Sequence, residues 1–211
     1  MKIAVLGKGM VGGTLGRRWA ELGHEVTFGV RDPSAPEATT LAEETGAAVT
    51  GVVGAAAGAD VVVVAVPFAV AADVLGQAGD LTGTIVIDTT NAVGEGYVPA
   101  VPTGTSAADA IAAAAPGAHV VKAFNAMSFR TMADPGDFPI LPSVWIAGDD
   151  PDARATVAEL AAELGLEPID AGPLAAAVLL EHAAILWIKL AYTEGFGRDF
   201  AFALVRRDGA D

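Results

Sequence analysis

The residues with the clearest chemical signature lie near the start of the chain, where residues 7–12 read Gly-Lys-Gly-Met-Val-Gly. This G-x-G-x-x-G spacing follows an apolar run and opens a stretch of helical character. In a strand–turn–helix unit the first glycine makes the tight turn, the second lets the backbone approach a diphosphate, and the third allows close packing. The helix N-terminus then attracts the phosphates; a glycine turn without a ligand is the alternative. The predicted diphosphate-binding residues are Gly7, Lys8, Gly9, Met10, Val11 and Gly12.

Arg31 indicates which dinucleotide is preferred. An NAD site usually carries an acidic residue about 20 residues beyond the glycine motif, where it binds the ribose 2′-hydroxyl. Here Arg31 stands at that position, and a guanidinium can face a 2′-phosphate with paired hydrogen bonds, with Lys8 as a second positive charge. The alternative is an exposed Arg31 paired with Asp32, which would also admit NAD. We therefore predict NADP as the cofactor and keep NAD as an alternative.

Further cofactor contacts are expected at the ends of later strands, because ligands of open α/β sheets bind beyond the carboxyl ends of the strands. The segment 66–68 should pass over the ribose and diphosphate. The two asparagines would place amides near the ribose and the carboxamide, although asparagine also forms turns. A small residue, Ala123, would let a ring lie close. These predicted contacts are Val66, Pro67, Phe68, Asn91, Ala123 and Asn125.

The sequence contains none of the usual catalytic sets. There is no cysteine, no G-x-S-x-G and no H-E-x-x-H, and no metal site is predicted. We expect His24 to be exposed and His119 and His182 to be structural. Lys122 could act as a catalytic lysine, but a strand-end salt bridge is favoured. Direct hydride transfer between two cofactors would need no protein acid or base, only alignment of the two rings.

The elements that must position these residues alternate between strand-like and helix-like segments. This pattern predicts a Rossmann-like, doubly wound α/β fold with a mostly parallel sheet. Strands are expected at 2–7, 25–30, 47–51, 60–67, 84–88, 119–124, 143–148 and 166–171. Helices are expected at 10–22, 35–45, 68–78, 105–115 and 151–165, the last with Asp150 as its N-cap, Pro151 at its first position and Gly165 at its end.

Residues 1–211 are expected to form one domain, with the sheet and its helices at 1–172 and a helical tail at 173–211. Residues 174–193 are apolar on most sides, which is typical of a buried helix, and a second amphipathic piece is expected at 198–206. We predict that the tail covers the acceptor site or forms a homodimer contact. Trp187 or Tyr192 would anchor that contact while the other lines the ring pocket. The alternative is that the helix folds back over its own sheet.

Composition narrows the class of protein. Apolar residues make up 53% of the chain, and the formal net charge is −14, which disfavours nucleic acid as a partner. The longest uncharged apolar stretch lies between Asp60 and Asp73 and is interrupted by Pro67. It is shorter than the ~20 residues that a membrane helix needs, and no signal-peptide pattern is visible. We expect a soluble, cytoplasmic protein with small-molecule partners and no membrane contact.

The chain resembles the coenzyme F420-dependent NADP oxidoreductase family, which includes the cytosolic NADPH-binding domain of the STEAP ferric reductases. The resemblance runs through nearly the whole length. It is carried by GKGMVG, GHEVTFGVRDP, VIDTTN, VVKAFNAMSFRTMADP and the closing LEPIDAGPL…LLEHAAILWIKLAYTEGFGRDFAF. It implies hydride transfer between NADP(H) and a deazaflavin (F420) or flavin ring. The second ring would stack over the nicotinamide near Met127 and residues 171–174, with Asn125 and Met127 aligning it. F420-using members tend to carry histidine at the position of Asn125, whereas asparagine is typical of the ferric-reductase-like branch.

Two other functions compete with this one. The chain could be an NAD(P)-dependent reductase of a small substrate, with a dimer partner completing the site. It could also be a non-catalytic NADP sensor, although no partner-docking surface or extra domain is visible in the sequence.

Overall fold

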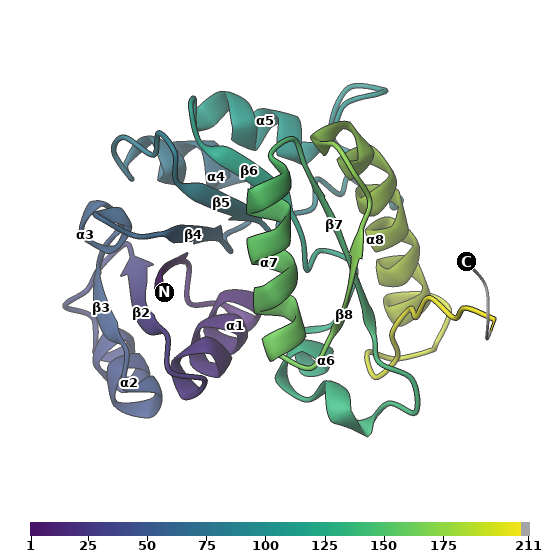
Figure 1. Ribbon diagram of the computed structural model, residues 1–211, viewed down its shortest axis with the longest axis horizontal. Helices are drawn as coiled ribbons and strands as arrows, with labels where there is room; N and C mark the ends of the chain where they lie inside the picture. Colours follow the sequence, from purple (N-terminus) through teal and green to yellow (C-terminus); the bar gives the residue numbers. More distant parts are fainter. Residues whose placement is uncertain (208–211) are drawn as a thin grey trace.

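A single eight-stranded sheet organises the molecule, and a computed structural model describes residues 1–207 (Figure 1). Its strand order is β3-β2-β1-β4-β5-β6-β7-β8. The strands are β1 (Lys2–Leu6), β2 (Glu25–Val30), β3 (Ala48–Gly51), β4 (Val61–Val64), β5 (Ile85–Asp88), β6 (His119–Lys122), β7 (Ser143–Gly148) and β8 (Glu167–Asp170). All pairs are parallel except β6 with β7. The predicted Rossmann-like, mostly parallel fold is confirmed.

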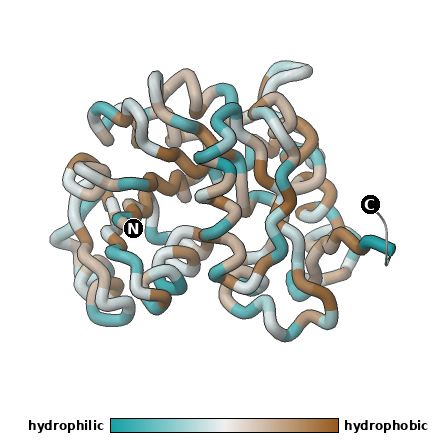
Figure 2. The backbone as a smooth tube through the Cα atoms, viewed as in Figure 1, coloured by the Kyte–Doolittle hydropathy of each residue, from teal (hydrophilic) through white to brown (hydrophobic). Residues whose placement is uncertain are grey.

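Helices cover both faces of this sheet. The helices are α1 (Met10–Glu21), α2 (Pro36–Thr45), α3 (Val52–Ala56), α4 (Phe68–Gly76), α5 (Ala107–Ala114), α6 (Phe129–Ala133), α7 (Pro151–Glu163) and α8 (Ala177–Tyr192). One apolar core lies under α1, α2, α6 and α7, and a second lies under α3, α4, α5 and the start of α8. Strand side chains alternate between the two cores, so the all-valine strand β4 is completely buried. The apolar strands are visible as brown segments through the centre of Figure 2.

The predicted elements match this architecture closely. All eight predicted strands and all five predicted helices are present, with ends that differ by at most three residues. The caps of α7 are also confirmed, because Asp150 Oδ1 accepts from the Ala153 N–H at 2.8 Å and Gly165 has φ +86°. The five-residue helices α3 and α6 were not predicted. Helices this short show too little of the 3.6-residue period to be recognised.

The tail follows the prediction only in part. A short 3-10 turn, Leu174–Ala176, leads into α8, but no helix forms at 198–206, so that prediction is wrong. Ser143 holds this segment instead: its N–H donates to the Phe202 carbonyl at 2.9 Å, and its Oγ accepts from the Leu204 N–H at 2.8 Å. These bonds to the start of β7 replace the bonds of a helix. Residues 208–211 of the predicted tail lie outside the described residues.

Helix α8 packs back onto its own domain along one side. Trp187 is 5% exposed, its Nε1 donates to the Phe200 carbonyl at 3.1 Å, and its ring stacks on Phe200. Trp187 is therefore covered by its own chain, whereas Tyr192 is 60% exposed. That one of the two anchors a dimer contact stays a prediction. Residues 174–192 are long and apolar enough to cross a membrane by length and composition alone. Buried helices of soluble proteins meet the same criterion, and Glu181 of α8 is buried in an ion pair.

Candidate functional site: the crevice at the switch point

The strand order reverses between β1 and β4, and the glycine turn lies at this switch point. Chain connections run outward from β1 through β2 to β3 on one side, and from β4 onward on the other. The Gly7 N–H donates to the Gly29 carbonyl at 3.1 Å, and the Ala65 N–H donates to the Leu6 carbonyl at 2.9 Å. Neighbouring strand ends thus hold the turn where doubly wound folds bind their ligands.

Each glycine of the turn meets a different steric demand. Gly7 has φ +111°, and a Cβ there would lie 2.5 Å from the Ala65 carbonyl oxygen. A Cβ on Gly12 would lie 2.2 Å from the Gly7 carbonyl oxygen, so only glycine allows α1 to approach the turn this closely. A Cβ on Gly9 would meet nothing within 4 Å. Gly9 therefore leaves open a space that a side chain would fill, which is the arrangement a diphosphate requires.

The N-terminus of α1 offers unpaired donors beside this space. Its N-cap is Gly9, no side chain of residues 1–207 caps it, and its first turn contains no acidic residue. Met10 is 61% exposed at the start of the helix. The first N–H groups and the positive end of the helix dipole are therefore free to bind an anion.

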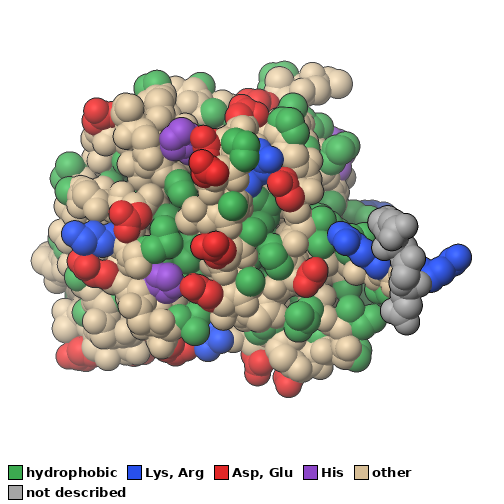
Figure 3. Space-filling view, viewed as in Figure 1, with side chains coloured by type: hydrophobic (Ala, Val, Ile, Leu, Met, Phe, Trp, Pro, Cys, Tyr) green, Lys and Arg blue, Asp and Glu red, His purple; other side chains and the backbone are tan. Residues whose placement is uncertain are grey.

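A cavity of about 420 Å³ extends from the turn over the ends of β2 and β4. Its lining includes Gly7, Lys8, Arg31, Val66 and Pro67, so five of the predicted contacts share one cavity. Figure 3 shows many acidic side chains on one face of the molecule, in keeping with the net charge of −14. Against that background, the cavity contains two cations, Lys8 and Arg31, and one carboxylate, Asp73, so its lining has a net positive charge that favours anions.

Arg31 is free to serve this cavity. It is exposed and makes no salt bridge within residues 1–207, so the alternative of an Arg31–Asp32 pair is not what the structure shows. Asp32 instead accepts from the Ser34 Oγ–H at 2.6 Å and from the Ser34 N–H at 2.9 Å. The hydrogen bonds from Ser34 hold the pKa of Asp32 below its ordinary value. Ser34 therefore keeps that carboxylate engaged apart from the guanidinium.

The predicted asparagines come together at the ends of β5 and β6. Asn91 Nδ2 donates to the backbone carbonyl of Asn125 at 2.8 Å, and Asn125 Nδ2 donates to Asn91 Oδ1 at 3.0 Å. Asn125 Nδ2 also donates to the Leu180 carbonyl of α8 at 3.0 Å. Phe124, just before Asn125, has φ +62°. Such a backbone is costly for a bulky residue and persists only where surrounding contacts impose it, which is common at functional sites.

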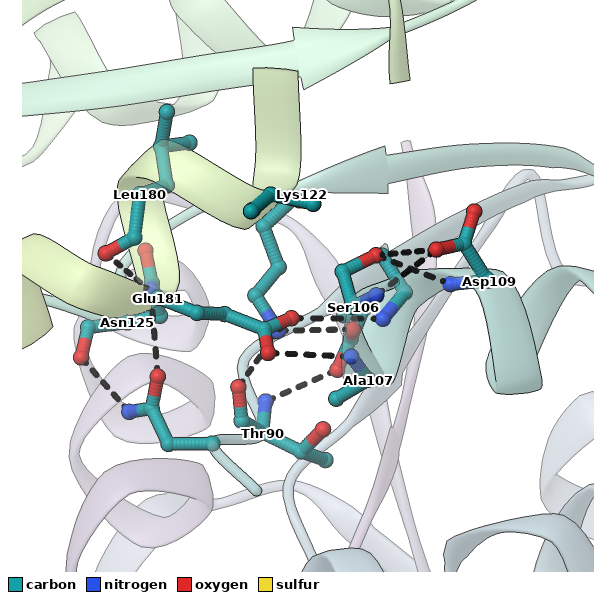
Figure 4. Close-up of polar contacts among 12 residues, drawn as sticks. Thr90, Ser106, Ala107, Asp109, Lys122, Asn125, Leu180 and Glu181 are labelled. Carbon is teal, nitrogen blue, oxygen red and sulfur yellow. Dashed lines mark hydrogen bonds and ion pairs between the residues drawn. The ribbon is translucent and has the colours of Figure 1, made fainter. Parts of the chain in front are cut away.

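A buried charge network lies beside Asn125 (Figure 4). Lys122 is completely buried, and its Nζ lies 2.9 Å from both Asp88 Oδ2 and Glu181 Oε1. It also donates to the Thr90 carbonyl, so all three ammonium hydrogens are used. The predicted salt bridge of Lys122 is confirmed. Its second partner, Glu181, was not predicted, although a lone glutamate in an apolar helix is a signal that could have identified it.

Other predicted contacts are placed less favourably. Phe68 begins α4 at the edge of the crevice and is half-buried. Ala123 has no exposed surface and belongs to the apolar core, so the structure does not support its predicted contact with a ring. Met127 lies in the same core and is 8% exposed, and Leu174 is 7% exposed. The role of Met127 in ring alignment stays a prediction.

The histidines have structural partners. His24 is not exposed as predicted, because its side chain is 10% exposed and its Nε2 lies 2.7 Å from Glu163 Oε2. This contact joins the loop after α1 to the end of α7. His119 lies 3.5 Å from Asp150, and His182 Nδ1 lies next to the Val178 carbonyl within α8. Among the described residues no group of acidic side chains and histidines could hold a metal ion.

A doubly wound sheet with a glycine turn and free cations at its switch point defines a dinucleotide-binding Rossmann protein. The family model for F420-dependent NADP oxidoreductases matches residues 2–92. The chain is also 35% identical to a candidate F420-dependent NADP-reductase from Arthrobacter sp. FB24, with a TM-score of 0.87 over 98% of this chain and 100% of that one. The chain belongs to the F420-dependent NADP oxidoreductase family.

Two further similar proteins are longer than this chain. The chain is 32% identical over 179 residues to metalloreductase STEAP3 of Rattus norvegicus, which covers 83% of this chain and 35% of that protein. It thus spans about a third of that relative's length. A reductive aminase from Aspergillus terreus in complex with NADPH is 20% identical, with a TM-score of 0.69 over 92% of this chain and 63% of that one. At this identity the likeness shows the fold alone.

Proposed function

We propose that this protein binds NADP(H) in the crevice at the switch point and transfers a hydride between its nicotinamide and the ring of a deazaflavin (F420) or flavin. The observation that carries the proposal is that Gly7, Lys8 and Arg31, which has no salt bridge within residues 1–207, line one cavity. This cavity adjoins the turn in which Gly9 leaves space open at the N-terminus of α1. The family to which the chain belongs supports the same cofactor.

Different residues of the crevice would hold different parts of NADP(H). The turn 7–12 would hold the diphosphate with backbone N–H groups, and Arg31 with Lys8 would hold the 2′-phosphate. Val66 and Pro67 line the same cavity, and Phe68 follows them at the start of α4. This segment would pass along the ribose. Asn91 and Asn125 mark the nicotinamide end, because they lie at the carboxyl ends of β5 and β6.

Hydride transfer between two rings needs no acidic or basic side chain of the protein. Bound NADP(H) supplies the hydride or receives it, and a flavin-like ring is its counterpart. Lys122 has no free ammonium hydrogen, and His24 is engaged with Glu163. The protein would act by fixing the distance and angle between two rings. Because Lys122 and His24 are engaged, the site suits hydride transfer between two rings better than a reduction that needs a proton from the protein.

The test is to mix the protein with NADPH and, in turn, F420, FMN, FAD and a quinone, while following the nicotinamide absorbance. We expect rapid loss of that absorbance with F420 or a flavin. A parallel assay offers small carbonyl and imine substrates, and loss of absorbance only with these would favour the small-substrate reductase. Tight NADPH binding without oxidation by any acceptor would favour the sensor, and absence of NADPH binding would refute the proposal.

A homodimer and a cytoplasmic location are part of the same proposal. The outer side of α8 is apolar yet uncovered within the described chain: Leu179 is 70% exposed and Leu186 is 50% exposed. Clustered exposed apolar residues are uncommon on monomers, and a second copy of the chain would cover them by two-fold packing. The proposed contact is therefore this exposed face of α8, which also includes Tyr192.

A further inference from the structure

Two backbone carbonyls decide how the amides of Asn91 and Asn125 are oriented. Asn91 Nδ2 donates to the Asn125 carbonyl, and Asn125 Nδ2 donates to the Leu180 carbonyl. A backbone carbonyl can only accept, so a flipped amide would set one oxygen against another. The oxygen and nitrogen positions of both amides therefore follow from the chemistry of their partners, as amide assignments must.

This orientation leaves one polar atom of Asn125 available. Both hydrogens of its Nδ2 are used, one by Asn91 Oδ1 and one by the Leu180 carbonyl. Its Oδ1 accepts no hydrogen bond within residues 1–207, yet it is absent from the set of buried unpartnered atoms, which are Arg18 Nε, Thr90 Oγ1 and Thr131 Oγ1. Asn125 thus presents an accessible acceptor at the carboxyl end of β6.

Glu181, the residue after Leu180, joins α8 to Lys122 and to the start of α5. The Glu181 carboxylate lies 2.9 Å from Lys122 Nζ and accepts from the Ala107 and Ala108 N–H groups at 2.9 and 3.3 Å. These N–H groups open α5, where the positive end of the helix dipole favours a carboxylate. Figure 4 shows Glu181 reaching from α8 toward Lys122 and the start of α5, with Leu180 beside Asn125. The charged groups of this network, Lys122, Asp88 and Glu181, all have partners, which favours one placement of α8 against α5.

We infer that α8 is a positioning element of the nicotinamide site: Glu181, anchored to Lys122 and α5, holds the Leu180 carbonyl so that Asn125 Oδ1 accepts the carboxamide N–H of the nicotinamide. This inference rests on the proposed NADP(H) function. Asn125 is then specificity-determining, because its fixed acceptor favours a ring substituent that carries an N–H. Glu181 acts only through Leu180 and Asn125.

The first experiment compares two ligands on the unchanged protein. NADP⁺ and its 3-acetylpyridine analogue differ in that the acetyl group lacks the carboxamide N–H donors. We expect NADP⁺ to bind about two- to tenfold more tightly, the worth of one net hydrogen bond. Asn125→Ala should bring the two dissociation constants together. Equal binding of both ligands by the unchanged protein would overturn the inference whatever the variants do.

The second experiment tests the role of α8. Glu181→Gln keeps the side chain's size and leaves the Lys122–Asp88 pair in place, so the fold should persist. We expect this variant to lose the preference for NADP⁺ over the analogue while binding 2′-phospho-ADP-ribose, which has no nicotinamide, as before. Ser106→Ala is the matched control. It removes the N-cap of α5, at a typical cost for a helix cap. The hydrogen bonds of the Ser106 hydroxyl go to Asp109 and not to α8, so this variant should keep the preference.

The outcomes separate the two proposals. Full ligand preference in a folded Glu181→Gln variant, or equal loss of NADP⁺ and 2′-phospho-ADP-ribose binding, would refute the positioning role. The latter would indicate general disruption of the domain. A protein that binds neither ligand overturns the proposed function, and this inference with it.

Discussion

Replacing Arg31 by alanine tests the cofactor assignment most directly. The guanidinium stands beside the glycine turn, in the cavity that also contains Lys8, and its neighbour Asp32 is engaged by Ser34. Arg31 therefore has no intramolecular partner to lose within the described residues. Removing it should leave the fold unchanged and weaken only a ligand that carries a phosphate at the ribose 2′ position.

The size of the effect follows from the exposure of the site. A hydrogen bond to a charged group contributes about 1.5–3 kcal/mol, which corresponds to roughly 10- to 150-fold in affinity. Because Arg31 is exposed, solvent and salt screen it, and we expect the lower half of this range. The loss should shrink further as the salt concentration rises. NADH lacks the 2′-phosphate, so its affinity should change little.

The assay is equilibrium titration of the nicotinamide fluorescence with NADPH and with NADH, at two salt concentrations. Arg130→Ala is the matched control, since it removes the same charge from an exposed guanidinium that pairs with Asp199 and does not line this cavity. Its affinity for NADPH should remain within about twofold of the unchanged protein, because distant exposed charges are screened. Equal losses of NADPH and NADH affinity in Arg31→Ala would show that Arg31 does not bind the 2′-phosphate.

Three further predictions address the turn, the pH dependence and the assembly. Gly9→Val would fill the open space at the turn, so it should abolish NADPH binding in a protein that still unfolds cooperatively. Retained NADPH binding in a folded Gly9→Val variant would refute the site. Gly12→Ala would place a Cβ against the Gly7 carbonyl, so it should lower the unfolding temperature. Burial raises the pKa of Asp170, but the Gly172 N–H and the Arg154 guanidinium lower it more, so its net pKa lies below the ordinary 3.8. A lowered pKa stabilises the fold above 3.8 and loses that contribution as pH falls through the folded value. The unfolding temperature of Asp170→Asn should therefore lie below that of the unchanged protein near neutral pH and converge with it in acid; a constant gap would contradict this. Leu186→Glu should convert a dimer to monomers in light scattering at micromolar concentration, and a mass near 21.1 kDa for the unchanged protein would exclude the dimer.

Local patterns in the sequence determined most of the sheet and the phosphate turn. Continuous valine and isoleucine runs such as β4 are recognisable because a strand covered on both faces must be apolar throughout. The turn at residues 7–12 is recognisable because the close approach of chain and ligand excludes side chains at fixed spacings. Arg31 could be predicted for a similar reason, since its position is a fixed distance along the chain from the turn.

Only the tertiary structure decided how distant residues combine at the nicotinamide end. Lys122 could be predicted to form a salt bridge, but its partner Glu181 lies 59 residues later, on a helix whose orientation no local pattern specifies. The burial of Trp187 against Phe200 depends in the same way on where the tail returns. Local propensity and periodicity act over a few neighbouring residues, whereas the partner of a buried charge is chosen by packing across the whole domain. For this reason the sequence predicted Asn125 as a site residue, and the fold alone decided which atom of its amide is left for a ligand.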